Sequence, residues 1–142
     1  MSSITYKQTQ TIIGATLAKG AEMGLKPLSV VVLDAGGHPL AFARQDGAAP
    51  GRFEIARGKA YGAVMLGMSG SAQMARAEAQ AYFMAAVNGA YGGKVIPVPG
   101  GILVKDDAGA VIGAVGVTGD TSDNDAEAGM AGLAAAGLAG EA

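Results

Sequence analysis

The chain has 142 residues, a formal net charge of −2, 24 glycines and no cysteine, and half of its residues are hydrophobic. The length favours one domain with an adequate core. Without cysteine the chain has no disulfides, iron–sulfur clusters or thiolate-bound metal or haem, and without a basic cluster or an apolar run of ~18 residues it indicates neither nucleic-acid binding nor a membrane span.

The apolar share and the few charges predict that part of the surface is hidden in a homo-oligomer, a dimer or larger. The first residues, MSSITYKQTQ, lack the basic and apolar segments of a signal peptide. We therefore expect a cytoplasmic protein, unless an export signal has been removed.

The first predicted element is a helix that begins after Thr5. Thr5 and Gln8 fit a capping box, in which each side chain bonds to the backbone of the other residue. Apolar residues at helical spacing follow, and Gly24 and Pro27 mark the end of the helix.

A hairpin follows the first helix. The valine-rich run 28–34 is typical of a buried strand, AGGH turns the chain, and 39–44 forms the partner strand. Leu40, Phe42 and Arg44 share a face of this second strand, because the side-chain period of a strand is two. Arg44 would therefore lie at the edge of an apolar face, where a ligand could meet it.

The middle of the chain predicts two helices, over 52–67 and about 71–87, with loops at 45–51 and after 87. The apolar stripe of the first of these helices leaves Lys59 on its rim. That stripe consists of Phe53, Ala56, Ala60 and Val64.

The last third of the chain predicts strands at 101–105 and 110–117, joined by the turn DDAG, and a helix from about 122 to 138. The predicted order is helix, strand, strand, helix, helix, strand, strand, helix. The hairpins make the sheet antiparallel, with helices packed on it, in a single α/β (α+β) domain over residues 1–142.

The stretch PVPGGILVKDDAGAVIGAVGVTGD carries a glycine corner at each end. Glycine marks sharp backbone turns or places where another group approaches the backbone closely. The corners are therefore either turns or two walls of one ligand pocket. A nucleotide P-loop is excluded in practice, because the lysine of its signature is missing.

Two further motifs each have a structural and a functional interpretation. The acidic run that includes Asp123 could bind calcium, but Ala128 and Ala134 stand where an EF-hand needs glycine and glutamate. Helix capping by Thr121 or Asp123 is the favoured alternative. The single histidine, His38, is either a polar turn residue or an iron ligand or proton shuttle.

Arg44, Asp46 and Lys59 could converge on an anion. The alternative is a surface ion pair that contributes little to stability. In an anion site, arginine would offer a fork to a carboxylate and lysine a point charge. Backbone amides could complete the site as a nest at Gly100, Gly101 and Gly119.

An ordered series of motifs spans nearly the whole chain: VVVLDAGGHPLAFARQDGA, ARGKAYGAV, PVPGGILV and GAVGVTGDTSDNDAEAGMAGLAAA. This series resembles the HbpS/GlcG family, which includes a haem-binding extracellular protein, the glycolate-operon protein GlcG and the C-terminal domain of PduO. The resemblance implies a profilin-like sheet of five strands, flanked by helices and assembled into oligomers. The fifth strand is implied by the resemblance alone.

The resemblance also implies a pocket, at a cleft between subunits, that both glycine corners face. Its members would be Arg44, Asp46, Lys59, Gly100, Gly101 and Thr118. A small-ligand-binding protein follows, with haem or another tetrapyrrole as the ligand. His38 or Thr118 would then reach the iron, and no metal site is built from protein ligands alone.

Two alternatives stay open. The first is a cofactor-independent lyase, isomerase or hydratase for a small organic acid, in which Arg44 holds the carboxylate and Lys59 or Asp46 moves a proton. The second is a structural or partner-binding protein without a pocket, whose glycine- and alanine-rich helices form interfaces.

Overall fold

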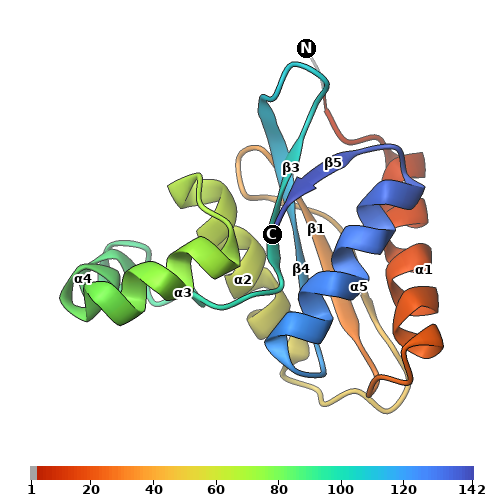
Figure 1. The fold of residues 1–142 in the computed structure, drawn as a ribbon, viewed down its shortest axis with the longest axis horizontal. Coiled ribbons are helices and arrows are strands. Elements are labelled where there is room, and N and C mark those ends of the chain that lie inside the picture. Colours follow the sequence, from red (N-terminus) through yellow and green to blue (C-terminus); the bar gives the residue numbers. More distant parts are fainter. Residues whose placement is uncertain (1–2) are drawn as a thin grey trace.

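The computed structural model describes residues 3–142, which form five helices and a five-stranded sheet (Figure 1). In chain order the elements are α1 (Tyr6–Glu22), β1 (Ser29–Asp34), β2 (Pro39–Arg44), α2 (Arg52–Leu66), α3 (Gly70–Ala79), α4 (Ala81–Ala90), β3 (Gly101–Lys105), β4 (Val111–Thr118), α5 (Ser122–Ala135) and β5 (Ala139–Glu141).

The sheet has the order β2-β1-β4-β3-β5, and all of its neighbouring strands are antiparallel. The predicted fold class is thus confirmed, and so is the strand that only the family resemblance implied. That strand, β5, pairs with β3 at one edge, and β2 forms the other edge.

Helices cover both faces of the sheet. Alternate residues of β1 point to opposite faces: Val30 and Val32 pack in a core cluster with residues of α1 and α5, whereas Val31 and Leu33 pack with alanines of α2. Helices α1 and α5 lie side by side on the first face, and α2 lies on the second (Figure 1).

Glycines let α2 approach the sheet unusually closely. A Cβ atom at Gly116 would collide with the carbonyl oxygen of Ala56, and one at Gly101 would collide with that of Lys59. Any side chain at either glycine would therefore push α2 away from β3 and β4. The close approach fixes which residues of α2 can reach the end of β4.

The capping box of α1 is confirmed. Thr5 Oγ1 accepts a hydrogen bond from Gln8 N, and Gln8 Oε1 accepts one from Thr5 N. The end of α1 also agrees with the sequence, because Gly24 takes a left-handed conformation with φ 69°.

The single helix predicted for residues 71–87 is wrong, because two helices replace it. The backbone of Gln80 leaves the helical conformation, at φ −142° and ψ 66°. Arg76 bridges this break: its Nε donates to Gln80 Oε1, and its guanidinium lies 4.3 Å from the centre of the Phe83 ring. Helices α3 and α4 together form an arm that extends from the sheet (Figure 1).

The helix predicted to reach residue 138 ends earlier, at Ala135. Gly137 reverses the chain in a left-handed conformation, with φ 73°. The residues that follow then turn back along β3 as the short strand β5.

Candidate functional site

The two glycine corners meet in space at the end of β4. Val117 N donates to the carbonyl oxygen of Gly100 over 2.9 Å. Gly100 has φ 106°, and a Cβ atom there would lie 2.5 Å from Val117 O and 2.9 Å from Lys59 Nζ. The group that approaches this backbone is therefore the ammonium of Lys59.

Lys59 is buried, with 3% of its surface exposed, so its predicted place on the rim of α2 is wrong. Its Nζ donates to Asp125 Oδ2 over 3.2 Å and to Val117 O over 3.0 Å. Desolvation lowers the pKa of Lys59, and the opposite charge of Asp125 counteracts part of this shift. The rim position was wrong because the glycines of β3 and β4 admit α2 so closely that its lysine enters the interior.

The β4–α5 turn supplies the partner of this lysine. Asp125 Oδ1 accepts from Asp120 N over 2.9 Å, which leaves Oδ2 for Lys59. Bonds from the Asn124 side chain and from the Lys26 and Thr121 amides lower the pKa of Asp120 to about 2. The ion pair thus connects α2 to α5 through an ordered turn.

The acidic run caps a helix, as predicted. Thr121 is the cap of α5, and its side chain accepts a hydrogen bond from Asn124 N. Within residues 3–142, no group of three or more histidine and acidic side chains is placed to hold a metal ion.

A second side chain of α2 also reaches the end of β4. Arg52 Nη1 donates to Thr118 Oγ1 over 2.8 Å. Thr118 is 1% exposed, so its hydroxyl is reached through Arg52 and not from solvent. Gly119 lies beyond it at φ 146°, against the backbone of Pro27 and Leu28.

Arg44 and Asp46 stay apart from Lys59. Both are exposed, at the end of β2 and in the loop that follows. No ion pair within the described part of the chain joins either residue to another side chain. The three residues that the sequence grouped as one anion site therefore occupy two environments.

His38 lies at the other end of the β1–β2 hairpin. The register pairs Ser29 with Arg44 at one end, and Asp34 N donates to His38 O at the other. The His38 side chain is exposed, and its ring makes no hydrogen bond within residues 3–142. His38 and Thr118 therefore cannot serve the same small site.

Sequence reasoning missed three residues of the β4 end: Arg52, Asp125 and Ser29. Asp125 belongs to the acidic run, which the sequence assigned only to calcium binding or helix capping. A buried lysine needs a nearby carboxylate. A prediction that Lys59 is buried would therefore also have predicted an acidic partner for it. For Arg52 and Ser29 the sequence carries no comparable signal.

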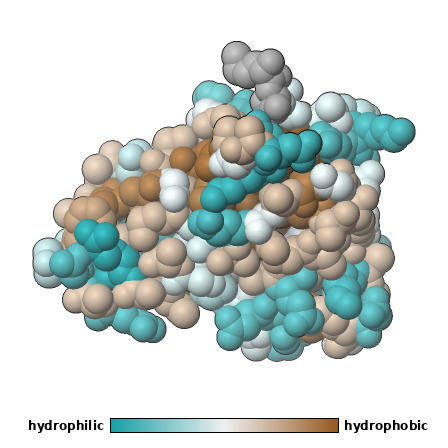
Figure 2. Space-filling model, turned by 45° about the horizontal axis from the view of Figure 1, so that its top comes forward, coloured by the Kyte–Doolittle hydropathy of each residue, from teal (hydrophilic) through white to brown (hydrophobic). Residues whose placement is uncertain are grey.

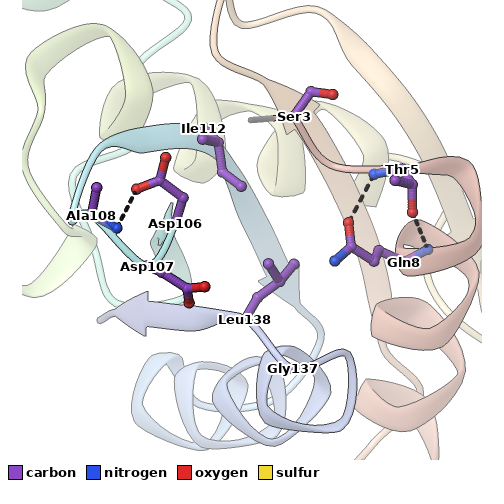
Figure 3. A pocket seen from close by; sticks show the side chains of 9 residues that line it. All are labelled: Ser3, Thr5, Gln8, Asp106, Asp107, Ala108, Ile112, Gly137 and Leu138. Atoms are coloured by element: carbon purple, nitrogen blue, oxygen red, sulfur yellow. Dashed lines mark hydrogen bonds between the residues drawn. The ribbon is translucent and has the colours of Figure 1, made fainter. Parts of the chain in front are cut away.

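A cavity of about 630 Å³ opens at the opposite end of the sheet. It lies between the start of α1, the β3–β4 turn and the α5–β5 connection (Figure 3). Its acceptors already serve local structure, since Gln8 caps α1 and Asp106 bonds to the amide of Ala108. No predicted site residue lines it; its lining is Ser3, Thr5, Gln8, Asp106, Asp107, Ala108, Ile112, Gly137 and Leu138.

None of the helices formed by residues 3–142 has the length and apolar character needed to cross a membrane.

Residues 4–134 match the family described as haem-degrading protein HbpS-like. The chain therefore belongs to this family. The sequence matches no curated protein.

Several solved structures share the fold. Protein ORFY of Klebsiella pneumoniae is 26% identical, with a TM-score of 0.85 over 96% of this chain and 92% of that one. A doubly substituted HbpS of Streptomyces reticuli is also 26% identical, with a TM-score of 0.79 over 94% and 87%. A complex of PduOC with haem is 21% identical, with a TM-score of 0.86 over 97% and 98%, which shows a common fold.

Proposed function

We propose that this chain, as a member of the HbpS-like family, is a small-ligand-binding protein that takes haem or a similar tetrapyrrole at the turn of the β1–β2 hairpin. The observation that carries the proposal is the exposed His38 imidazole, in a turn whose Gly37 packs against Tyr61 of α2. The family description supports haem as the ligand.

Of the two candidate iron ligands, His38 fits and Thr118 does not. The imidazole of His38 is exposed and has no hydrogen bond within the described chain, so neither ring nitrogen is engaged there. The hydroxyl of Thr118 is buried and accepts a hydrogen bond from Arg52. An imidazole is also one of the usual protein ligands of haem iron.

The residue before His38 packs against groups that suit a flat, anionic ligand. Its neighbour Gly37 packs on α2, where a Cβ atom would lie 3.3 Å from the ring of Tyr61. The Tyr61 and Tyr91 rings are 6.0 Å apart, and Lys94 Nζ lies 5.8 Å from the centre of the Tyr61 ring. The tyrosines offer apolar ring surface to a porphyrin, and Lys94 a charge for a propionate.

When bound, haem would supply redox and oxygen chemistry at its iron. The chain itself would contribute the imidazole of His38, the apolar surface of Tyr61 and the cation of Lys94. Lys59 has no part in this site, because its charge is neutralised by Asp125 inside the protein.

A hemin titration of the purified protein, followed in the Soret region, tests the proposal. We expect a saturable, shifted band that His38→Ala abolishes and Lys94→Gln weakens. Thr118→Val serves as the matched control and is expected to leave the band unchanged. A spectrum of free hemin, or a shift that His38→Ala leaves intact, would overturn the proposal.

We further propose that the protein is a homo-oligomer, as its composition predicts. Large apolar side chains remain exposed on the single chain, with Tyr82 at 74% and Leu40 at 41%. Figure 2 shows hydrophobic residues in a band across one face of the molecule. Light scattering measures the molar mass in solution, and a mass equal to that of one 13.9 kDa chain would overturn the proposal.

A further inference from the structure

A row of three polar side chains crosses the sheet at the end opposite His38. Ser29 pairs with Arg44 on one side and with Thr118 on the other. Val31 and Leu33, further along β1, pack against α2. Because side chains alternate along a strand, Ser29 and its paired neighbours face α2 as well.

The start of α2 lies over this row. Arg52, its first residue, donates to Thr118, and the ring of Phe53 lies 4.9 Å from that of Phe42. Gly51 precedes the helix and gives no side-chain bond to its first turn. The partial positive charge of a helix N-terminus therefore lies at the same end of the sheet.

Ser29 supplies an independent observation. Its side chain is fully buried, and its hydroxyl has no hydrogen-bond partner within residues 3–142. Leaving a buried hydroxyl unpaired costs free energy, so buried polar groups are nearly always paired. A ligand that reaches under Arg52 would supply the missing partner.

Two arginines at this end keep unused donors, although the β2–α2 loop and the first turn of α2 also carry the carboxylates of Asp46 and Glu54. Arg52 makes one hydrogen bond with its guanidinium, to Thr118. Arg44 is exposed, and its guanidinium makes none within the described residues. A guanidinium carries N–H donors in a fork that matches the two oxygens of a carboxylate.

We propose that Arg44, Arg52 and the hydroxyl of Ser29 form a binding site for the carboxylate of a small organic ligand, at the N-terminus of α2. The site is separate from the hairpin turn at His38. It differs from the anion site expected from sequence, because Arg52 and Ser29 replace Lys59 and Asp46.

Isothermal titration with malonate, at constant ionic strength, tests the site. We expect saturable binding that Arg44→Gln and Ser29→Ala each weaken at least about tenfold, the loss of one charge-assisted or buried hydrogen bond. Lys105→Gln removes a cation elsewhere on the sheet and is expected to leave malonate affinity unchanged. His38→Ala is also expected to leave it unchanged, which separates this test from the hemin titration.

The unpartnered hydroxyl gives a second readout. Without ligand, Ser29→Ala is expected to keep or raise the melting temperature, because it removes an unpaired buried group. Thr16→Val is the matched control, since Thr16 Oγ1 is also buried without a partner but lies on α1. It is expected to leave malonate affinity unchanged.

Three outcomes would overturn the proposal. The first is the absence of saturable heat with malonate. The second is an equal loss of affinity in Arg44→Gln and Lys105→Gln, which would indicate unspecific attraction to charge. The third is tighter binding of inorganic phosphate than of malonate in a parallel titration, which would assign the site to a phosphate.

Discussion

Strands β4 and β2 belong to the same sheet with only β1 between them. The polar groups at the end of β4 are nevertheless buried and bonded, whereas those of β2 are exposed. Almost every residue of β4 is buried, and the groups at its end are bonded to Lys59 and Arg52. The edge strand β2 exposes alternate side chains and carries His38 before its first residue and Arg44 at its last.

The difference shows that residue type alone does not decide between a structural and a binding role. Lys59 and Arg44 are both cations near the same end of the sheet. Lys59 is buried and paired with Asp125, so it holds α2 to α5. Arg44 is exposed and unpaired, so its guanidinium is available to an anionic ligand. Variants of the buried contacts measure how firmly the central strand depends on them.

The largest effect is expected from Lys59→Met. The substitution leaves the buried Asp125 carboxylate without its cation, which costs roughly 3–5 kcal/mol of unfolding free energy. Urea denaturation measures this loss. Adding Asp125→Leu should recover most of it, because the unpaired charge is then removed as well. A loss below about 1 kcal/mol in the single variant would show that the ion pair does not hold α2 to α5.

Gly100→Ala is expected to lower the unfolding free energy by about 2–3 kcal/mol. The new Cβ would need a positive φ and would press on Val117 O and Lys59 Nζ. Gly109→Ala is the matched control: φ there is 84°, but no atom lies within 4 Å, so about 1 kcal/mol is expected. Equal losses in the two variants would contradict the close packing of the glycine corners.

Thr118→Val should cost about 1–2 kcal/mol, since Arg52 loses the acceptor of a charge-assisted hydrogen bond. Thr11→Val removes a longer, exposed bond to Lys7 O and should change the unfolding free energy by less than about 0.5 kcal/mol. Thermal denaturation of both variants measures the difference. If Thr118→Val leaves the unfolding free energy unchanged, the hydrogen bond from Arg52 does not stabilise the end of β4.

The smallest effect is expected from Asp120→Asn, and it should disappear in acid. The pKa of Asp120 falls from 3.8 to about 2 in the folded protein, through its bonds to Asn124 and to backbone amides. Its ionised form therefore contributes stability above pH 3.8, and this contribution is lost as the pH falls through about 2. Over this range, the unfolding free energy measured by denaturation should depend less on pH for Asp120→Asn than for the unmodified protein.

Most of the fold could be predicted because its signals are local. The capping box at Thr5 and the valine-rich β1 each depend on neighbouring residues. Strand β5 could not be predicted, since three residues with a central glycine carry no alternation and depend on β3 for pairing. The break at Gln80 was also hidden, because it involves neither proline nor glycine.

The site could be predicted only in part. The two glycine corners do lie together, but the sequence could not show that Lys59 fills the space between them. Periodicity describes one helix at a time, and the partner of Lys59 stands 66 residues later in another helix. The unpaired hydroxyl of Ser29 depends on three-dimensional packing and leaves no trace in the sequence.

The break at Gln80 has a consequence for how the molecule opens. Helix α4 packs mainly on α3 and adds only Met84 to the buried hydrophobic residues. Regions with few buried contacts unfold locally at a lower free energy than the whole molecule. The amides of α4 should therefore exchange with deuterium well before those of β4, as a separate cooperative unit that can rearrange while the sheet stays intact.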